Sequence, residues 1–293
     1  MILIIGGRSK IGASLIGDLL AKGQQVRVLV RAGEPADGIP SSVETVAGDL
    51  ADEGSLVTAM SGAERVFLLS SPHPDAVAWH RNAVDAARRS EVRLLVRSSI
   101  LGAGRETGAE FITAHTASDR YLEGSGLPYV ILRPNLFLQN IPESTIPAIG
   151  ASGNFYVNAG QARISMVDTR DVAAVAAAAL TQDRHAGARY DLTGPQALSY
   201  SDVAAKLASA LGRPVSYVSA PDEAVRQALL GGGLDQWFAG ALVGLYQDYR
   251  RSGTDGYAAQ VTDTVQRVTG RPPRSLGGLL GELARDRPGT LGD

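Results

Sequence analysis

The sequence predicts an α/β protein: a Rossmann-type, doubly wound parallel sheet with a smaller, interleaved C-terminal lobe. Three observations lead to this prediction. Residues 1–5 form an unbroken apolar run followed at once by a glycine-rich turn at 6–12, apolar segments then alternate with helical patterns, and the chain becomes loop-rich beyond residue 135. A strand that is buried on both faces is continuously apolar, and regular alternation of such strands with helices is typical of βαβ units.

The elements of the expected sheet follow one another at short intervals. We expect strands at 1–5, 26–30, 43–47, 65–69, 92–96 and 127–135, and helices at 13–22, 53–60, 75–89 and 106–124. Right-handed crossovers between parallel strands bring the carboxyl ends of the strands to one edge of the sheet. A ligand is therefore expected at that edge, where the strand order reverses.

The second half of the chain is expected to contribute to both parts of the molecule. Residues 1–135 form the predicted dinucleotide-binding domain, and 163–183 rejoin it as a strand at 163–167 and an alanine-rich helix. Residues 136–162 and 184–293 form the predicted smaller, substrate-binding lobe. Its expected helices lie at 201–211, 222–230, 234–251 and 258–268, and three glycines at 231–233 separate two of them as a turn or a hinge.

Composition excludes several classes of function. The chain has 293 residues, 44% hydrophobic content, a formal net charge of -2 and no cysteine. Because positive charge is not clustered in the sequence, no direct binding to nucleic acid is expected. Because there is no cysteine, the chain has no disulfide, thiol nucleophile or cysteine-ligated metal. The four histidines show no metal-ligand spacing, so we expect no metal. No apolar run approaches the roughly 20 residues that span a bilayer, and no signal peptide is recognisable, so we expect a cytoplasmic protein without membrane association.

The turn after the first strand carries the first candidate site. Glycines there let backbone N–H groups approach a diphosphate, and the following helix points its positive N-terminus at the same place. Ser9 stands where the middle glycine of a G-x-x-G-x-x-G pattern belongs, so its side chain must turn away from a diphosphate or hydrogen-bond to it. The candidate cofactor-binding residues of this turn are Gly6, Gly7, Arg8, Ser9, Lys10, Ile11 and Gly12.

Residues at the other strand ends add to this candidate site. Arg31 directly follows the second strand, where many dinucleotide folds place an acidic residue for the ribose 2′-hydroxyl. A guanidinium suits a 2′-phosphate instead, and Arg8 could reach the same group, so NADP(H) is the expected cofactor. The alternative is that both arginines are solvated surface charges. Further candidates near the adenine and the nicotinamide are Asp49, Leu50, Ser70 and Ser71.

Longer motifs show a family resemblance over nearly the whole chain. They are the segments SGLPYVILRP at 125–134, MVDTRDVA at 166–173, YDLTGP at 190–195 and VTGRPP at 268–273. Together they resemble NmrA-like atypical short-chain dehydrogenases/reductases, a family similar to NADPH:quinone oxidoreductases and phenylcoumaran benzylic ether reductases. The resemblance implies NAD(P)H binding and reductase chemistry.

The resemblance also identifies candidate catalytic residues. Conventional members of the wider superfamily carry a Tyr-x-x-x-Lys pair on the helix at 106–124, and here Phe111 and His115 occupy the two positions. Phe111 has no proton to donate. His115, with an ordinary pKa near 6.5, is expected either to donate a proton or to anchor the cofactor ribose, and Ser99 is expected to orient a substrate carbonyl.

Three hypotheses about function remain at this stage. The first is an NADPH-dependent reductase of a small apolar quinone, enone or aromatic metabolite, with Asn135, Phe137 and Phe155 as candidate substrate contacts. The second is a non-catalytic NADP(H) sensor that acts through a protein partner, because Phe111 replaces the usual tyrosine. The third is a redox-neutral enzyme of secondary metabolism. The substrate is not readable from the sequence, and association into a homodimer is left open.

Overall fold

The computed structural model describes residues 1–286, and residues 287–293 of the expected lobe lie outside the described part. Seven parallel strands form the central sheet in the order β3-β2-β1-β4-β5-β6-β8. Their bounds are β1 (Ile2–Ile5), β2 (Val26–Val30), β3 (Glu44–Ala47), β4 (Arg65–Leu68), β5 (Leu94–Ser98), β6 (Tyr129–Pro134) and β8 (Arg189–Leu192). The predicted Rossmann-type sheet is confirmed. The strand order reverses beside β1, which is where such folds bind their ligands.

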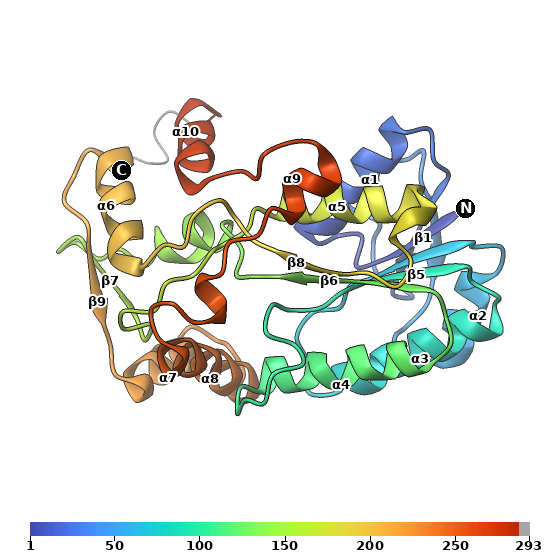
Figure 1. Cartoon of the computed structure of the whole chain (residues 1–293), viewed down its shortest axis with the longest axis horizontal. Helices are drawn as coiled ribbons and strands as arrows, with labels where there is room; N and C mark the ends of the chain where they lie inside the picture. The colour runs from blue at the N-terminus through green and yellow to red at the C-terminus, as the bar shows by residue number, and fades with distance from the viewer. Residues whose placement is uncertain (287–293) are drawn as a thin grey trace.

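Helices cover both faces of this sheet (Figure 1). One face carries α1 (Lys10–Ala21), α5 (Thr169–Thr181) and α9 (Thr264–Thr269), and the other carries α2 (Glu53–Met60), α3 (Ala76–Arg89) and α4 (Glu110–Gly124). Each face has its own apolar core, and the side chains of β1 alternate between the two: Ile2 and Ile4 join one core, Leu3 and Ile5 the other. This alternation explains why β1 is apolar throughout.

The smaller lobe lies to the left of the main sheet in Figure 1. Its side chains form a third apolar core. It contains a two-stranded parallel sheet, β7 (Asn154–Val157) with β9 (Ser216–Ser219), and the helices α6 (Tyr200–Leu211), α7 (Asp222–Gly231), α8 (Gln236–Ser252) and α10 (Leu276–Asp286). Three short helical turns connect elements: η1 (Ile141–Thr145), η2 (Asp183–His185) and η3 (Tyr257–Ala259). Gly231 is the last residue of α7, and Gly232 and Gly233 form the turn that follows it.

The prediction that 184–293 belongs wholly to the lobe is wrong in two places. β8 pairs with β6 as an edge strand of the main sheet, and Leu192 is fully buried there. α9 packs on the same side as α5, with Val265 and Val268 in the main core. Both elements are short, so their apolar residues do not reveal in sequence which core they join.

Two element predictions are also corrected. Residues 163–167 do not form a strand; the structure has only isolated bridges there, between Val167 and Phe137 and between Ile164 and Leu198. The expected helix 258–268 is interrupted, because Thr262 donates its backbone N–H to the Thr193 hydroxyl and its own hydroxyl to the Asp191 carbonyl. These bonds hold the segment beside β8 rather than in a helix. Among residues 1–286 no helix combines the length and hydrophobicity needed to cross a bilayer.

Candidate dinucleotide-binding site

In the turn after β1, the three glycine positions leave no room for a side chain. Gly6 has a φ of +87°, which L side chains rarely adopt, and a Cβ on it would stand 2.6 Å from the Leu69 carbonyl oxygen. A Cβ on Gly12 would stand 2.2 Å from the Gly6 carbonyl oxygen, and one on Gly7 would stand 2.6 Å from a Val28 methyl. The turn is therefore closed tightly on itself, as a backbone cradle for a diphosphate requires.

Ser9 is used inside the turn rather than against a ligand. It is the N-cap of α1: its hydroxyl accepts from the Gly12 N–H at 3.0 Å and donates to the Gly6 carbonyl at 2.8 Å. Within the described residues, the backbone N–H groups of Arg8, Lys10 and Ile11 have no acceptor. Free amides at a helix N-terminus are a common anion site.

A cleft of about 450 Å³ opens above this turn. The sequence-predicted residues that line it are Gly6, Gly7, Arg8, Ser9, Arg31, Asp49, Leu50, Ser70 and Ser71. Three predicted residues of the turn do not line it. The Lys10 ammonium pairs with Glu143 of η1 at 2.6 Å, the Ile11 side chain packs in the main core, and Gly12 is buried. For Ile11 only the backbone N–H is left to serve a ligand.

The two arginines expected at a 2′-phosphate share a carboxylate that sequence reasoning missed. Glu34 also lines the cleft, and its carboxylate forms an ion pair with Arg8 and stands 3.5 Å from the Arg31 guanidinium. The signal was available, because Glu34 lies a few residues after β2, where dinucleotide folds often place an acidic residue.

An aromatic pair beside the end of β4 was also missed. His73 and Trp79 line the cleft, and their rings stack with centroids 4.1 Å apart. Trp79 lies in the first turns of α3, which brings it over the same strand end as Ser70 and Ser71. An apolar ring surface of this kind is a suitable wall for a flat ligand group.

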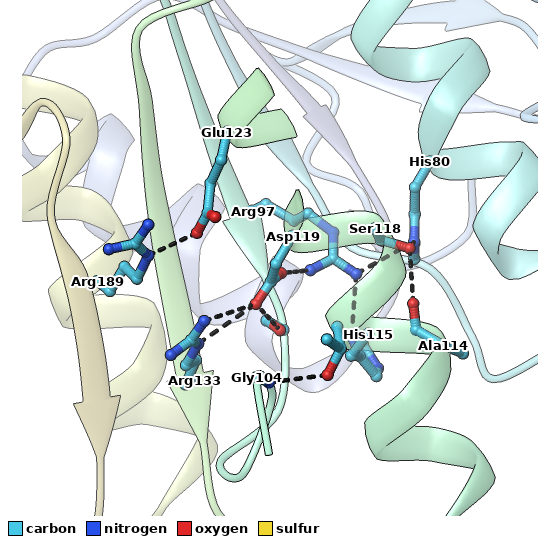
Figure 2. Close-up of polar contacts among 12 residues, drawn as sticks. His80, Arg97, Gly104, Ala114, His115, Ser118, Asp119, Glu123, Arg133 and Arg189 are labelled. Atoms are coloured by element: carbon cyan, nitrogen blue, oxygen red, sulfur yellow. Dashed lines mark hydrogen bonds and ion pairs between the residues drawn. The ribbon is translucent and has the colours of Figure 1, made fainter. Parts of the chain in front are cut away.

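Behind the cleft a buried guanidinium organises the candidate catalytic helix (Figure 2). Arg97 of β5 is fully buried and forms an ion pair with Asp119 of α4. Its Nη2 stands 3.0 Å from Nδ1 of His115 and 3.2 Å from Nδ1 of His80. His115 and Asp119 are four residues apart, so both face β5 from one side of α4.

Arg97 determines the tautomers of both histidines. A guanidinium has donors only, so each Nδ1 that it contacts must accept, and the hydrogen of each neutral ring then lies on Nε2. His80 has two further contacts, Nε2 at 2.9 Å from the Ser70 hydroxyl and Nδ1 at 2.9 Å from the Ser118 hydroxyl. This tautomer requires Ser118 to donate to Nδ1 and Ser70 to accept from Nε2. Ser70 lines the cleft, so a continuous chain of hydrogen bonds joins the cleft wall to His115.

The electrostatics of this cluster favour neutral histidines. Burial, followed by the nearby charge of Arg97, lowers the pKa of His115 and of His80 well below 6.5. Burial lowers the pKa of Arg97 to about 10, so it stays a cation at neutral pH. Burial also raises the pKa of the Asp119 carboxyl, and the guanidinium groups of Arg97 and Arg133 counteract that rise.

Ser99 does not occupy the position expected of a catalytic hydroxyl. It is buried and donates its hydrogen to Asp119 at 2.9 Å, and Arg133 donates to the same carboxylate oxygen at 3.2 Å. Ser99 is thus part of the Asp119 cluster and does not line the cleft. Asp119 itself was missed, although a carboxylate four residues after His115 on a helix beside a buried arginine is a recognisable signal.

The expected substrate contacts Asn135, Phe137 and Phe155 are placed elsewhere. Asn135 is buried, and its amide donates to the Ser165 hydroxyl and the Ala258 carbonyl at 2.9 and 2.8 Å. Phe137 is partly buried against the main core. Phe155 is 1% exposed in the lobe core. Asn135 and Phe155 are thus occupied by the protein interior, whereas the partly buried Phe137 stays a candidate substrate contact.

Phe111, at the usual tyrosine position, joins α4 to the lobe. Its ring contacts Trp237 edge to face and Phe238 at a tilt, with both centroid distances at 5.7 Å. It is nearly buried and belongs to the lobe core. Phe111 therefore has a packing role. His115 follows one turn along the helix, and this predicted cofactor-binding residue does not line the cleft itself.

Comparison with known proteins assigns the chain. A family model described as NAD(P)H-binding matches residues 6–183, which include the glycine turn and α4. The chain belongs to this NAD(P)H-binding family. It is 35% identical over 277 residues to the NAD(P)H azoreductase of Xenophilus azovorans, which covers 94% of this chain and 95% of that protein.

Two further matches come from Escherichia coli. The chain is 28% identical over 287 residues to quinone oxidoreductase 2 of strain K12, covering 97% of this chain and 98% of that protein. The crystal structure of an NADPH-dependent quinone oxidoreductase complexed with NADPH has a TM-score of 0.87, 26% identity and coverage of 97% and 99%. The predicted resemblance to NAD(P)H-binding reductases such as NADPH:quinone oxidoreductases is confirmed.

The described residues of this NAD(P)H-binding protein fit the cofactor. The three glycines leave a cradle that a Cβ would fill, the free amides of the turn are available to an anion, and the cleft carries two guanidinium groups. Within residues 1–286 no group of three or more histidine, aspartate or glutamate side chains is arranged to hold a metal ion.

Proposed function

We propose that this chain is an NAD(P)H-dependent reductase of a small, apolar, electron-poor acceptor such as a quinone, an enone or an aromatic compound. Bound reduced nicotinamide supplies two electrons as a hydride. The proposal is supported by the glycine cradle and by relatives whose names describe azo and quinone reduction. The observation that carries it is the contact between Arg97 and Nδ1 of His115.

That contact specifies what His115 offers to an acceptor. Because Nδ1 accepts from Arg97, the ring presents Nε2–H and is neutral at ordinary pH. A neutral imidazole is a good hydrogen-bond donor but a poor acid, since losing its only N–H hydrogen would leave an imidazolate. We therefore infer that His115 stabilises negative charge on an acceptor oxygen or nitrogen by hydrogen bonding, and that water supplies the proton.

Arg8 and Arg31 support the use of NADP(H). Both line the cleft at the end of β2. A 2′-phosphate bound there would lie beside two guanidinium groups, whereas many dinucleotide folds have only an acidic residue at this position. Asp49 and Leu50 line the same region at the end of β3 and suit the adenosine half. Ser70, held by His80, lines the cleft on the side that leads to His115.

The experiment is to incubate the pure protein with NADPH and a chemically diverse panel of quinones, enones and azo compounds. We expect NADPH oxidation above background with at least one class. If calorimetry shows that NADPH binds but no acceptor causes oxidation, the reductase proposal fails. A partner captured with only one redox form of the cofactor would then support the sensor.

A further inference from the structure

The segment after β2 folds back so that an acidic side chain reaches the two cleft arginines. The Glu34 N–H donates to the Arg31 carbonyl at 3.1 Å, closing a turn in which Gly33 has a φ of +79°. A glycine at this position allows the left-handed backbone that the turn needs. The turn places the Glu34 side chain beside the end of β2, where a dinucleotide ribose is expected.

The Glu34 carboxylate is shared between the arginines. One oxygen pairs with Nη2 of Arg8, and the other stands 3.5 Å from Nη1 of Arg31. Arg8 also donates to the Pro35 carbonyl at 3.3 Å, which holds its guanidinium against the same turn. The Glu34 side chain is 31% exposed, less than Arg8 at 45% or Arg31 at 62%, so it lies on the inner side of the group.

This arrangement treats the two nicotinamide cofactors differently. The 2′-phosphate of NADPH needs the arginines, but their guanidinium groups are engaged by Glu34, and the carboxylate repels the phosphate. The 2′-hydroxyl of NADH needs an acceptor, which Glu34 provides without leaving the arginines. A single carboxylate therefore acts against one cofactor and in favour of the other.

We propose that Glu34 is a specificity-determining residue that lowers the preference of this chain for NADPH over NADH. Its carboxylate must move away from Arg8 and Arg31 before they can bind a 2′-phosphate, and it accepts a hydrogen bond from a 2′-hydroxyl. This inference rests on the proposed function only in requiring that the cleft bind a dinucleotide. It does not require turnover.

The test compares the dissociation constants of NADPH and NADH for the wild type, Glu34→Gln and a control, Glu44→Gln. Glutamine keeps the shape of glutamate and removes its charge. Glu44 on β3 is an exposed carboxylate that forms an ion pair with Arg27 at 2.7 Å but does not line the cleft. We expect Glu34→Gln to raise the ratio of the NADH to the NADPH constant roughly tenfold, the size of one like-charge contact at a partly exposed site, and the control to leave it unchanged.

The gain in NADPH affinity should also shrink in high salt, because exposed charges are screened. A ratio within twofold of wild type, a shift toward NADH, or an equal shift in Glu44→Gln would overturn the inference. Failure of both cofactors to bind the wild type would overturn it together with the proposed function. Binding with the predicted shift but no acceptor reduction would contradict the proposed function alone.

Discussion

Burying the Arg97 guanidinium costs several kcal/mol unless its donors and its charge are matched. Asp119 supplies the charge, and the two histidine rings accept from one guanidinium nitrogen. Among residues 1–286, Nε of Arg97 is buried without a partner. A protonated histidine at either position would place a second cation against Arg97. The arrangement therefore holds His115 in one tautomer and one charge state, which is the form that donates through Nε2.

The role of His115 can be tested by two substitutions. Leucine removes the donor, whereas glutamine keeps an N–H near the position of Nε2. We expect His115→Leu to lower kcat for acceptor reduction about 100-fold, as loss of one preorganised donor does, with little change in the dissociation constant of NADPH, and His115→Gln to retain most of the activity. Unchanged kcat with weakened NADPH binding would identify a ribose anchor instead. Steady-state kinetics and calorimetry provide the two values.

The lowered pKa of His115 predicts a pH dependence of stability. Its folded pKa lies below the unfolded value of about 6.5, so its contribution is fully present above that pH and is lost as the pH falls toward the folded pKa. Denaturant unfolding of the wild type and His115→Gln at pH 8 and pH 5.5 should show the wild type losing more stability on acidification. Parallel losses would mean that His115 titrates normally. The pKa of His80 is also lowered, and His80 is present in both proteins that are compared.

At the scale of elements, α1 contains a matched pair of glycines. A Cβ on Gly12 would stand 2.2 Å from a backbone oxygen, whereas Gly17 faces open space on the same helix. We expect Gly12→Ala to lose NADPH binding and to lower the melting temperature. Gly17→Ala should gain up to about 1 kcal/mol of stability, because alanine favours the helix.

Thermal unfolding with and without NADPH separates these effects. The cofactor should raise the melting temperature of the wild type and Gly17→Ala but not that of Gly12→Ala. If Gly12→Ala binds NADPH as tightly as the wild type, the tight closure of the turn is not needed for the cofactor.

Elements with a local signal were predictable. β1 was predicted at 1–5 because both of its faces are buried, but α1 begins at Lys10 rather than at the expected residue 13, because Ser9 is its N-cap. The segment 258–268 was not predictable, because Thr262 is held by hydrogen bonds from residues about 70 positions away. The position of a short element such as β8 is determined by the strand with which it pairs, here β6. The hydrophobic pattern of the sequence does not show which strand that is.

At the scale of the whole molecule, site residues with a local signal in the sequence were predicted more readily than those that depend on distant residues. The cleft residues that end successive strands, such as Arg31 and Ser70, were found because parallel strands bring their ends to one edge. Glu34 and Asp119 were missed although each has a local signal, because only the structure shows their partners Arg8 and Arg97. Phe155 was misplaced because an aromatic residue in a loop-rich segment packs in a core as readily as it faces a ligand.

The two parts of the molecule meet beside α4, the candidate catalytic helix. Phe111 of α4 packs against Trp237 and Phe238 of α8, and His115 follows one turn later on α4. Figure 1 shows α4 beside α8, and Figure 2 shows His115 on α4. The dinucleotide cleft lies on the sheet side, where the strand order reverses beside β1. This geometry suits a reaction between a dinucleotide on the sheet and a small molecule held near the lobe.

The most direct test of this account is a single-turnover experiment. Protein loaded with NADPH is mixed rapidly with an acceptor from the class that gives the highest activity, and nicotinamide absorbance and acceptor absorbance are followed together. The account predicts that both signals change at one rate and in equal amounts, and that His115→Leu slows them together. Bound NADPH that stays reduced with every acceptor class would contradict it.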